Sequence, residues 1–514
     1  MSHWIILPIV LPAFVAPFIV LAARHHVPIQ RVLSLASVLT LVALSAGLAW
    51  QVSDGSVLNY RLGDWAAPFG IVIVGDRLST LMILLTSTLA LFVLLYAVGS
   101  GWDARGKHFH ALFQFQLMGI LGAFLTGDLF NLFVFFEILL IASYGLMIHG
   151  GGDARLKAGT QYVLYNLIGS TLFLFALGSI YAETGTLNMA DLADRVALIG
   201  PEGTVGIRVA AVLLILVFAI KAALAPLHFW LPASYAEAPG PVAALFAVMT
   251  KVGAYAIIRV YTMIFPPGLE ATAGLHTLWL PPLAVISLAV GMIGVLAARR
   301  VDRLVAYSVV GSMGTVMIAI SLFSPEGIAA ALYYMVHSTF AAAILFLISD
   351  LVRTGRGGVR LDAAPPMAGG ALTAALFFAG AVAMTGLPPL SGFLGKLLVL
   401  DASRSSPWAV WIWAVILSSS LVAVLGFARA GSMLFWKAHD ETVPVPEEEN
   451  PVAPAPLAFV AVGGLIAALV LHTAFAGPIH GYMTDLSADL FGAEAYRETV
   501  LDGIGKMIVP DEEG

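Results

Sequence analysis

The feature that most constrains this chain is the regular recurrence of long apolar stretches. A helix that crosses the roughly 30 Å hydrocarbon core of a bilayer needs about 20 mainly apolar residues. Stretches of this length follow one another along almost the whole sequence of 514 residues, and only 11% of the residues are charged, whereas about a quarter are charged in an ordinary soluble domain. We therefore expect a chain that lies almost entirely in a membrane, without a separate soluble catalytic domain.

Fourteen apolar runs have about the length of a membrane span. They are continuous, as in LMILLTSTLALFVLLY, whereas the strands of a membrane barrel would appear as alternating segments of about ten residues. The predicted fold class is an all-α polytopic membrane protein with about 14 transmembrane helices. The runs cover residues 5–23, 31–50, 77–98, 109–126, 129–149, 158–182, 206–235, 241–263, 277–298, 303–323, 327–351, 370–401, 408–430 and 456–476.

Basic residues predict how the chain is oriented, because Lys and Arg are retained in cytoplasmic loops. Fourteen of the 25 basic residues fall in loops on one side, beginning with Arg24 and Arg31 and ending with Arg429 and Lys437. Eight fall on the other side, among them Arg77, and several of these adjoin carboxylates. This asymmetry, together with an even number of crossings, predicts that both termini face away from the cytoplasm.

Two spans contain prolines at their centre. The run AIKAALAPLHFWLPASYAEAPGP has Pro226 and Pro232, and the run AMTGLPPLSGFLGKLLVL has Pro388 and Pro389. Proline removes a backbone donor and clashes with the preceding turn, and the freed backbone groups are tolerated at membrane depth only inside protein or beside a wet cavity. Discontinuous helices 7 and 12 therefore predict two inverted five-helix repeats with a site near the midplane. Ordinary proline kinks are the alternative.

These predictions divide the chain into five parts. Residues 1–108 hold the first three helices, residues 109–263 the first repeat and residues 277–430 the second. Residues 431–455 form an acidic, proline-rich loop on the cytoplasmic side. Residues 456–514 hold the last span and an extracytoplasmic tail.

Five ionisable residues lie deep within apolar runs: Glu137, Lys221, Lys251, His337 and Lys396. Each central charge costs about 2.5–3.5 kcal/mol to insert, so four unpaired charges would cost about as much as the whole stability of a domain. The alternatives are lysines that reach the headgroups, a glutamate that is a fixed partner of a lysine, and a histidine that is only a hydrogen-bonded core residue. The joint pattern favours a function.

Burial disfavours the charged form of a lysine, and a nearby carboxylate favours it. A lysine whose carboxylate partner can approach or withdraw can thus take up and release a proton, and a histidine can accept on one ring nitrogen and donate from the other. The row predicts a proton relay across the membrane. His228, beside the first helix break, is a further candidate, with a plain interfacial histidine as the alternative.

Other functions are excluded or left without support. The chain has no cysteine, so it cannot form disulfides, thiolate metal sites or cysteine-bound iron–sulfur clusters. A net charge of -6 gives no reason to expect nucleic-acid binding. A Na+ or K+ site needs several converging oxygens, as for other hard cations, and Glu137 is the one deep carboxylate, because Asp128 is expected to cap a helix. We predict no metal site and no cofactor.

Three motifs carry a family resemblance: GDLFNLFVFFEILLIASY with Glu137, FAIKAALAPLHFWLPASYAEAPGPVAALFAVMTKVGAYAIIR with Lys221 and Lys251, and LPPLSGFLGK with Lys396. They resemble the antiporter-like membrane subunits shared by respiratory NADH:quinone oxidoreductase, membrane-bound hydrogenases and Mrp-type multisubunit cation/proton antiporters. The resemblance implies that Glu137 and Lys221 form a switchable pair. It also implies that Lys251 and His337 carry protons along a central axis, and that Lys396 leads to the exit.

Two details point to one branch of the family. The residue in span 12 is Lys396, where many oxidoreductase subunits have glutamate, and Ala341 stands where some members have a lysine. The loop ETGTLNMADLADR and the absence of a long lateral helix resemble the D subunit of Mrp antiporters. The resemblance implies a non-enzymatic, proton-translocating subunit in a bacterial inner membrane, with other Mrp subunits, protons, Na+ or K+ and lipid as partners. The alternatives are a proton-pumping subunit of a redox complex, a self-sufficient transporter, or charges that serve helix packing only.

Overall fold

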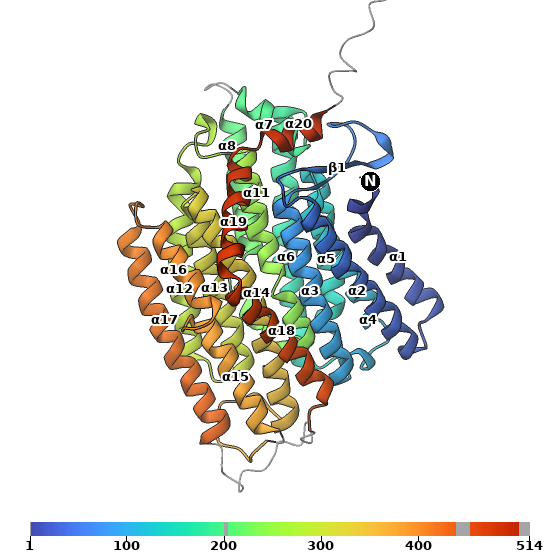
Figure 1. Ribbon diagram of the computed structural model, residues 1–514, viewed down its shortest axis with the longest axis vertical. Coiled ribbons are helices and arrows are strands. Elements are labelled where there is room, and N and C mark those ends of the chain that lie inside the picture. The colour runs from blue at the N-terminus through green and yellow to red at the C-terminus, as the bar shows by residue number, and fades with distance from the viewer. Residues whose placement is uncertain (1, 200–203, 368, 438–452, 503–514) are drawn as a thin grey trace, which may run out of the picture.

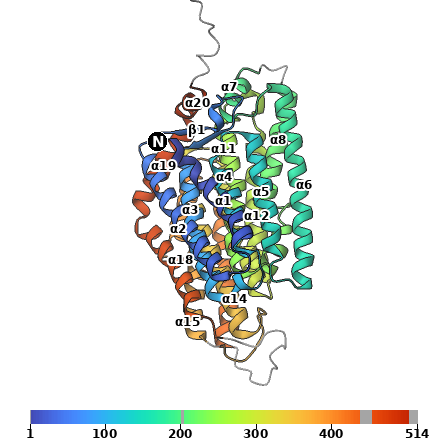
Figure 2. The ribbon, with the colours of Figure 1, turned by 90° about the vertical axis from the view of Figure 1, so that its right-hand side faces the viewer.

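The computed structural model describes residues 2–199, 204–367, 369–437 and 453–502. Most of the loop predicted at 431–455, and the end of the tail with Lys506, lie outside the described residues. Within them, eleven helices are long and apolar enough to cross a membrane, and α4 and α15 are shorter apolar helices. The helices run side by side (Figures 1 and 2). The all-α, multi-pass fold is thus confirmed, whereas the count of fourteen spans stays a prediction.

Each predicted apolar run is occupied by one helix or by two consecutive helices. These helices are α1 (Leu7–Ala22), α2 (Val27–Gln51), α3 (Arg77–Ser100), α4 (Phe109–Leu125), α5 (Leu129–Met147), α6 (Asp153–Thr184), α8 (Thr204–Lys221), α9 (Trp230–Glu237), α10 (Gly240–Phe246), α11 (Met249–Met263), α12 (Leu275–Ala297), α13 (Val301–Ser321), α14 (Pro325–Arg356), α15 (Gly370–Thr385), α16 (Ser391–Ala402), α17 (Ala409–Gly431) and α18 (Pro456–Ala474).

Three elements form the centre of the bundle. The most apolar stretches of α10–α11 and α14 are fully buried, and that of α13 is 94% buried, whereas those of α1, α2, α6, α17 and α18 are only 33% buried. The outer helices therefore turn apolar side chains outward, as lipid or a protein partner requires, and the central helices are enclosed by protein on all sides. Polar groups within these buried stretches have no access to lipid headgroups.

Both predicted helix breaks are present. Helix α8 ends at Lys221 and α9 begins at Trp230, with Pro226 between them, and α15 ends at Thr385 and α16 begins at Ser391. A third break was not expected, because its sequence contains no proline or glycine. It lies between α10 and α11, where the amides of Ala247 and Val248 bond to carbonyls three residues back, at 3.2 Å each. This tighter turn immediately precedes Lys251.

The ends of the chain form structure that the apolar pattern did not indicate. Beyond α18, where a tail was predicted, the chain continues as α19 (Ala476–Phe491) and α20 (Glu494–Leu501), and α19 packs against α14 and α11. An antiparallel hairpin pairs β1 (Leu58–Arg61) with β2 (Val72–Gly75). The hairpin, the short helix α7 (Met189–Ala197), α20 and the N-terminus all lie at one end of the molecule (Figure 1).

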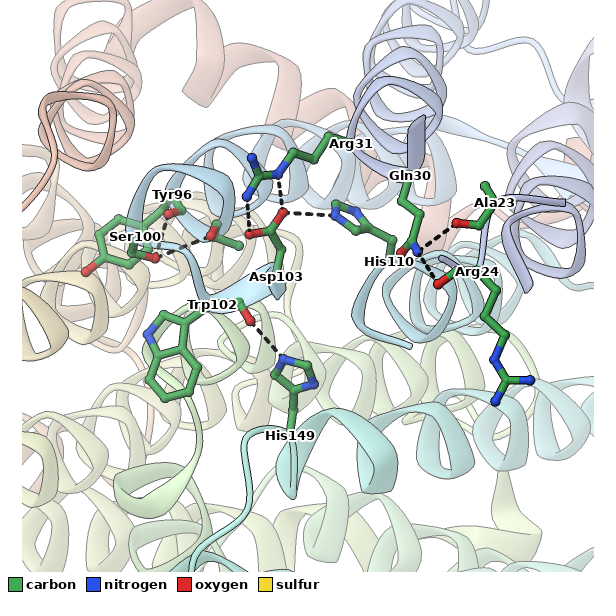
Figure 3. A network of polar contacts seen from close by, with 11 residues as sticks. Ala23, Arg24, Gln30, Arg31, Tyr96, Ser100, Trp102, Asp103, His110 and His149 are labelled. Carbon is green, nitrogen blue, oxygen red and sulfur yellow. Dashed lines mark hydrogen bonds and ion pairs between the residues drawn. The ribbon is translucent and has the colours of Figure 1, made fainter. Parts of the chain in front are cut away.

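At the opposite end, a buried carboxylate ties three elements together (Figure 3). Asp103, between α3 and α4, accepts from Arg31 Nε at 2.5 Å and Nη2 at 2.9 Å, and lies 3.2 Å from His110 Nε2. Its side chain is fully buried, whereas that of Arg31 is 34% exposed. Although burial alone would raise it, the hydrogen bonds from His110 and Arg31 and the charge of Arg31 hold the pKa of Asp103 below its usual range. The carboxylate thus joins α2, the α3–α4 connection and α4.

We expect Asp103→Asn to destabilise the fold by about 1–3 kcal/mol, because it removes the charge that the guanidinium and the imidazole share and leaves buried donors poorly satisfied. The lowered pKa means that the stabilisation is fully present above the carboxyl's unfolded pKa of about 3.9 and is lost as the pH falls through the lower folded value. The loss should therefore be the same from pH 5 to pH 8. Thermal unfolding of the purified protein in detergent, at a fixed heating rate, measures it.

The matched control is Asp401→Asn, which breaks an ion pair with Arg404 whose side chains are 61% and 69% exposed. An exposed pair contributes about 0–1 kcal/mol, so the unfolding midpoint should barely move. Equal midpoints for the two variants would contradict the anchoring role of Asp103.

Candidate functional site

The carboxylate of Glu137 and the ammonium of Lys221 lie on neighbouring helices but are not paired. Lys221, the last residue of α8, is buried at 7% exposure, and among the described residues no carboxylate oxygen lies within 4.0 Å of its Nζ. Its Nζ instead donates to Asn166 Oδ1 at 3.1 Å and lies 5.6 Å from the centre of the Phe136 ring. Glu137 directly follows Phe136 on α5, the helix that the Lys221 side chain approaches. The structure thus shows the predicted pair apart.

Asn166 is a site residue that the sequence reasoning missed. It lies on α6 at 2% exposure, and its amide nitrogen donates to Tyr162 O within its own helix at 2.8 Å, which leaves Oδ1 for Lys221. It stands in the apolar run YVLYNLIG, but an uncharged amide is an ordinary residue at helix contacts within a membrane and is no local signal of a function.

A small cavity adjoins Lys221. It is lined by Phe136, Leu139, Tyr162, Asn166, Lys221, Trp230, Met249 and Val252 and has a volume of about 10 Å³. That is room for about one water molecule. Since Met249 and Val252 flank Lys251 in sequence, the cavity lies between the Lys221 side chain and the helix turn that carries the next lysine.

Lys251 is completely buried on α11, and its Nζ has no hydrogen-bond partner among the described residues. Helix α11 reaches α8 at Gly253, where a Cβ would lie 2.8 Å from Phe218 O and from Ala222 N, and 3.0 Å from Lys221 Cβ. Glycine therefore allows the two lysine-bearing helices to touch. A permanent, unpaired ammonium at this depth is costly, so Lys251 is suited to holding a proton transiently.

His337 lies in the second half of the molecule, on α14, and is completely buried. Its Nε2 is 3.1 Å from Ala383 O, and its Nδ1 is 2.8 Å from Ser391 Oγ. Because a carbonyl can only accept, Nε2 carries the hydrogen, and in the neutral ring Nδ1 accepts from the serine hydroxyl. The two partners stand on opposite sides of the α15–α16 break, so the histidine bridges that break.

Lys396 closes the same break from α16. Its Nζ donates to Thr385 O, the last carbonyl of α15, at 2.8 Å, and to Ser420 Oγ on α17 at 2.9 Å. The last carbonyls of a helix lack helical partners and carry a partial negative charge. The ammonium thus satisfies a backbone group that the proline break set free.

The two remaining residues, His228 and Asp128, differ in how well their surroundings fit the roles predicted for them. His228 lies between α8 and α9 at 6% exposure, and its ring centre is 4.5 Å from that of Phe229 in a tilted arrangement. Its Nδ1 has no partner among the described residues. Among the residues that the structure describes, no hydrogen bond joins His228 to another candidate. Asp128 is confirmed as a helix cap, since its carboxylate accepts from Asn131 N at 2.9 Å.

The candidates therefore fall into two clusters. Glu137 and Lys221 lie with Asn166 at the first break, and His337 and Lys396 lie at the second. Lys251 lies between them, because its helix touches Lys221 at Gly253, and α10, which leads into that helix, packs against α14, the helix of His337. Across the described residues, no direct hydrogen bond joins any two of the five predicted relay residues, so passage between them requires side-chain movement or water.

Comparisons with known proteins agree on one family. The family model described as NADH:quinone oxidoreductase/Mrp antiporter, TM, matches residues 126–422. The chain is 38% identical to the probable D subunit of a K(+)/H(+) antiporter from Rhizobium meliloti, with 98% of each chain covered. It is 36% identical to the D subunit of a Na(+)/H(+) antiporter from Bacillus subtilis, over 98% of this chain and 100% of the relative.

Solved structures give the same result. A chain of the Mrp complex from Dietzia sp. DQ12-45-1b superposes with a TM-score of 0.87 at 26% identity, covering 98% of this chain and 100% of that one. A chain of respiratory complex I from Thermus thermophilus superposes with a TM-score of 0.79 at 25% identity, covering 97% and 100%.

The contact at Gly253 generates a stability prediction. A methyl group there meets backbone atoms that cannot rotate away, so Gly253→Ala should lower the thermal unfolding midpoint even though alanine favours a helix by about 1 kcal/mol over glycine. The control is Gly178→Ala on α6, where a Cβ meets nothing within 4 Å. That variant should unfold at the same temperature or slightly higher. A Gly253→Ala protein as stable as Gly178→Ala would show that the helices do not need this close contact.

Proposed function

The chain belongs to the NADH:quinone oxidoreductase/Mrp antiporter family, as a subunit of a cation/proton antiporter, and we propose that it carries the protons of the exchange. The cation exchanged is Na+ or K+, the two ions named for its antiporter relatives. The protons pass along Glu137, Lys221, Lys251, His337 and Lys396. The chain is a transporter component and not an enzyme, and it works within a multisubunit complex.

One observation carries this proposal: Lys221 is held by a neutral amide while a carboxylate lies unpaired beside it. Asn166 accepts a hydrogen bond from Lys221 without adding a charge, and Glu137 Oε1 is buried without a partner among the described residues. A fixed structural ion pair would be closed, since a separated buried pair loses its Coulomb attraction and keeps its desolvation cost. Lys221 therefore has two alternative partners, as a switch needs.

Proton transfer in the first half follows from these two positions. When Lys221 is near Glu137, the carboxylate stabilises the proton on its Nζ. When Lys221 moves to Asn166, that support weakens and the proton can leave through a water molecule in the adjoining cavity toward the Nζ of Lys251. Lys221 returns to Glu137 after it has been protonated again, and the same step can then be repeated.

The second half passes the proton across the α15–α16 break. His337 can receive it at Nδ1, while Nε2 keeps its hydrogen on the Ala383 carbonyl. Lys396 is the next group that can hold the proton, because Thr385 O and Ser420 Oγ accept hydrogen bonds from its Nζ and so stabilise the ammonium form. His228, next to the first break, is proposed as a further polar group at the entrance.

The two helix breaks also support the predicted pair of inverted repeats. Each lies in a span that carries one lysine of the row, at the end of α8 and within α16, in the segments 109–263 and 277–430. We infer that these segments are inverted five-helix repeats within a fourteen-span chain. The N-terminus and α20 lie at the same end of the molecule (Figure 1), as an even number of crossings requires. With the distribution of basic loops, this favours both ends outside the cytoplasm of a bacterial cell.

A proton-pumping subunit of a redox complex is the second candidate. It is favoured by the similarity to a chain of the membrane-bound sulfane sulfur reductase, with a TM-score of 0.84 at 25% identity, and to complex I. Purification with the native partners separates the two proposals. Flavin or iron–sulfur absorbance in the stoichiometric complex would overturn the antiporter assignment, and cation-driven proton movement without it would support that assignment.

We expect Glu137→Gln to lower exchange at least about tenfold, because glutamine cannot stabilise the proton on Lys221. The assay is Na+- or K+-driven proton movement in everted membrane vesicles that contain all subunits, followed with a pH-sensitive dye, and copurification of the partners checks assembly. Glu326→Gln, at an exposed position of α14, should exchange normally. Normal exchange by an assembled Glu137→Gln complex would contradict the switch.

Asn166 gives a test that the sequence alone did not suggest. Asn166→Leu removes the neutral position of Lys221, and Asn166→Asp replaces it by a second carboxylate that holds the ammonium. Both should slow exchange about tenfold or more in the same vesicles, for opposite reasons. Thr171→Val, an exposed position on the same helix, is the control. Exchange at the parental rate in both Asn166 variants would show that the amide is only a packing group.

A further inference from the structure

The outer helix α18 places a second histidine against the second helix break. His472 is only 5% exposed although it stands on a helix that is mostly uncovered. Its Nε2 lies 3.2 Å from Tyr333 O, and its ring stacks on that of Tyr333 with 4.4 Å between centres and 29° between planes. A histidine that only filled space at a lipid-facing helix would not need to be enclosed in this way.

His472 is close to His337. Tyr333 precedes His337 by four residues on α14, so the carbonyl that binds His472 lies about one helical turn, roughly 6 Å along the axis, from the central histidine. The neighbouring residue Thr473 also contacts Ser391, the hydrogen-bond partner of His337. The two imidazoles therefore belong to one polar cluster in the interior.

The next residue of α18 links the same two places. Thr473 Oγ1 accepts from the backbone N–H of Ser391 at 2.9 Å, and the hydroxyl of Ser391 lies 2.8 Å from His337 Nδ1. Helix α18 thus holds the first residue of α16, which is also the hydrogen-bond partner of His337. The hydroxyl of Tyr333 is buried nearby without a partner among the described residues, so the cluster offers an unused polar atom.

We propose that His472 is a sixth proton-carrying residue, which exchanges a proton with His337 and extends the second half of the relay from α14 to α18. The inference rests on the proposed function. In the step, the imidazolium of His337 loses a proton to one water molecule, and that water passes a proton to Nδ1 of His472. Nε2 of His472 keeps its own hydrogen, because the Tyr333 carbonyl can only accept.

The decisive variant is His472→Gln. The glutamine amide can still donate to Tyr333 O from nearly the place of Nε2, but it cannot bind a further proton. We expect a complex that assembles with its partners and unfolds at the parental temperature, with cation-driven proton movement reduced at least about tenfold in everted vesicles. The change His108→Gln, at an exposed position before α4, should exchange normally.

Three further variants make the result unambiguous. If His472→Gln exchanges at the parental rate while Lys251→Ala does not, the relay stands and the role of His472 is overturned. If both exchange normally, the proposed function itself fails. If neither His472→Gln nor His472→Asn assembles, His472 is a packing residue and the inference falls. Thr473→Val removes the acceptor for Ser391 and leaves His472 in place, and loss as severe as in His472→Gln would mean that α18 acts by positioning and not by carrying protons.

Discussion

The rest of the structure depends on the cost of leaving a polar group unpaired in hydrocarbon. At membrane depth no bulk water replaces a lost hydrogen bond, so every charged side chain and every freed backbone group must be enclosed and satisfied by protein. This is why the elements that carry Lys251 and His337, α11 and α14, are the most completely buried helices of the bundle. The other three proposed relay residues stand on α5, α8 and α16. The outer helices α1, α2, α6, α17 and α18 carry none of the five and form the enclosure.

Helix breaks leave backbone carbonyls without helical partners, and buried polar side chains need hydrogen-bond acceptors, so each can satisfy the other. Prolines end α15 early and release its last carbonyls, and these same carbonyls receive His337 and Lys396. At the first break, Ile220 O instead receives Trp230 Nε1 at 3.0 Å, and Lys221 turns to Asn166. The first break is thus closed without its lysine, whereas the second is closed by His337 and Lys396. This difference is why the proposed function places the change of partners at the first break.

Much of this arrangement could be predicted from particular residues. Pro226, Pro388 and Pro389 marked the two breaks, because a missing backbone donor is a property of the residue itself. The row of buried ionisable residues was visible because a charge within an apolar run is rare and costly. Asn166, His472 and the break before Lys251 were not found, since an uncharged amide, a histidine near a span end and a tight turn without proline carry no local signal. The continuation of α18 into α19 was missed because its sequence is less apolar than a span.

The sequence by itself determined that the chain is a bundle of membrane helices, where two of them break, and which five ionisable residues lie deep within apolar runs, because these follow from hydrophobic length, proline geometry and the cost of burying charge. Only the tertiary structure decided the partners: that Lys221 bonds to an amide and not to Glu137, that His337 spans the second break, and that α18 places His472 beside it. Partners depend on how residues far apart in the chain meet, and no local property of either residue specifies that meeting.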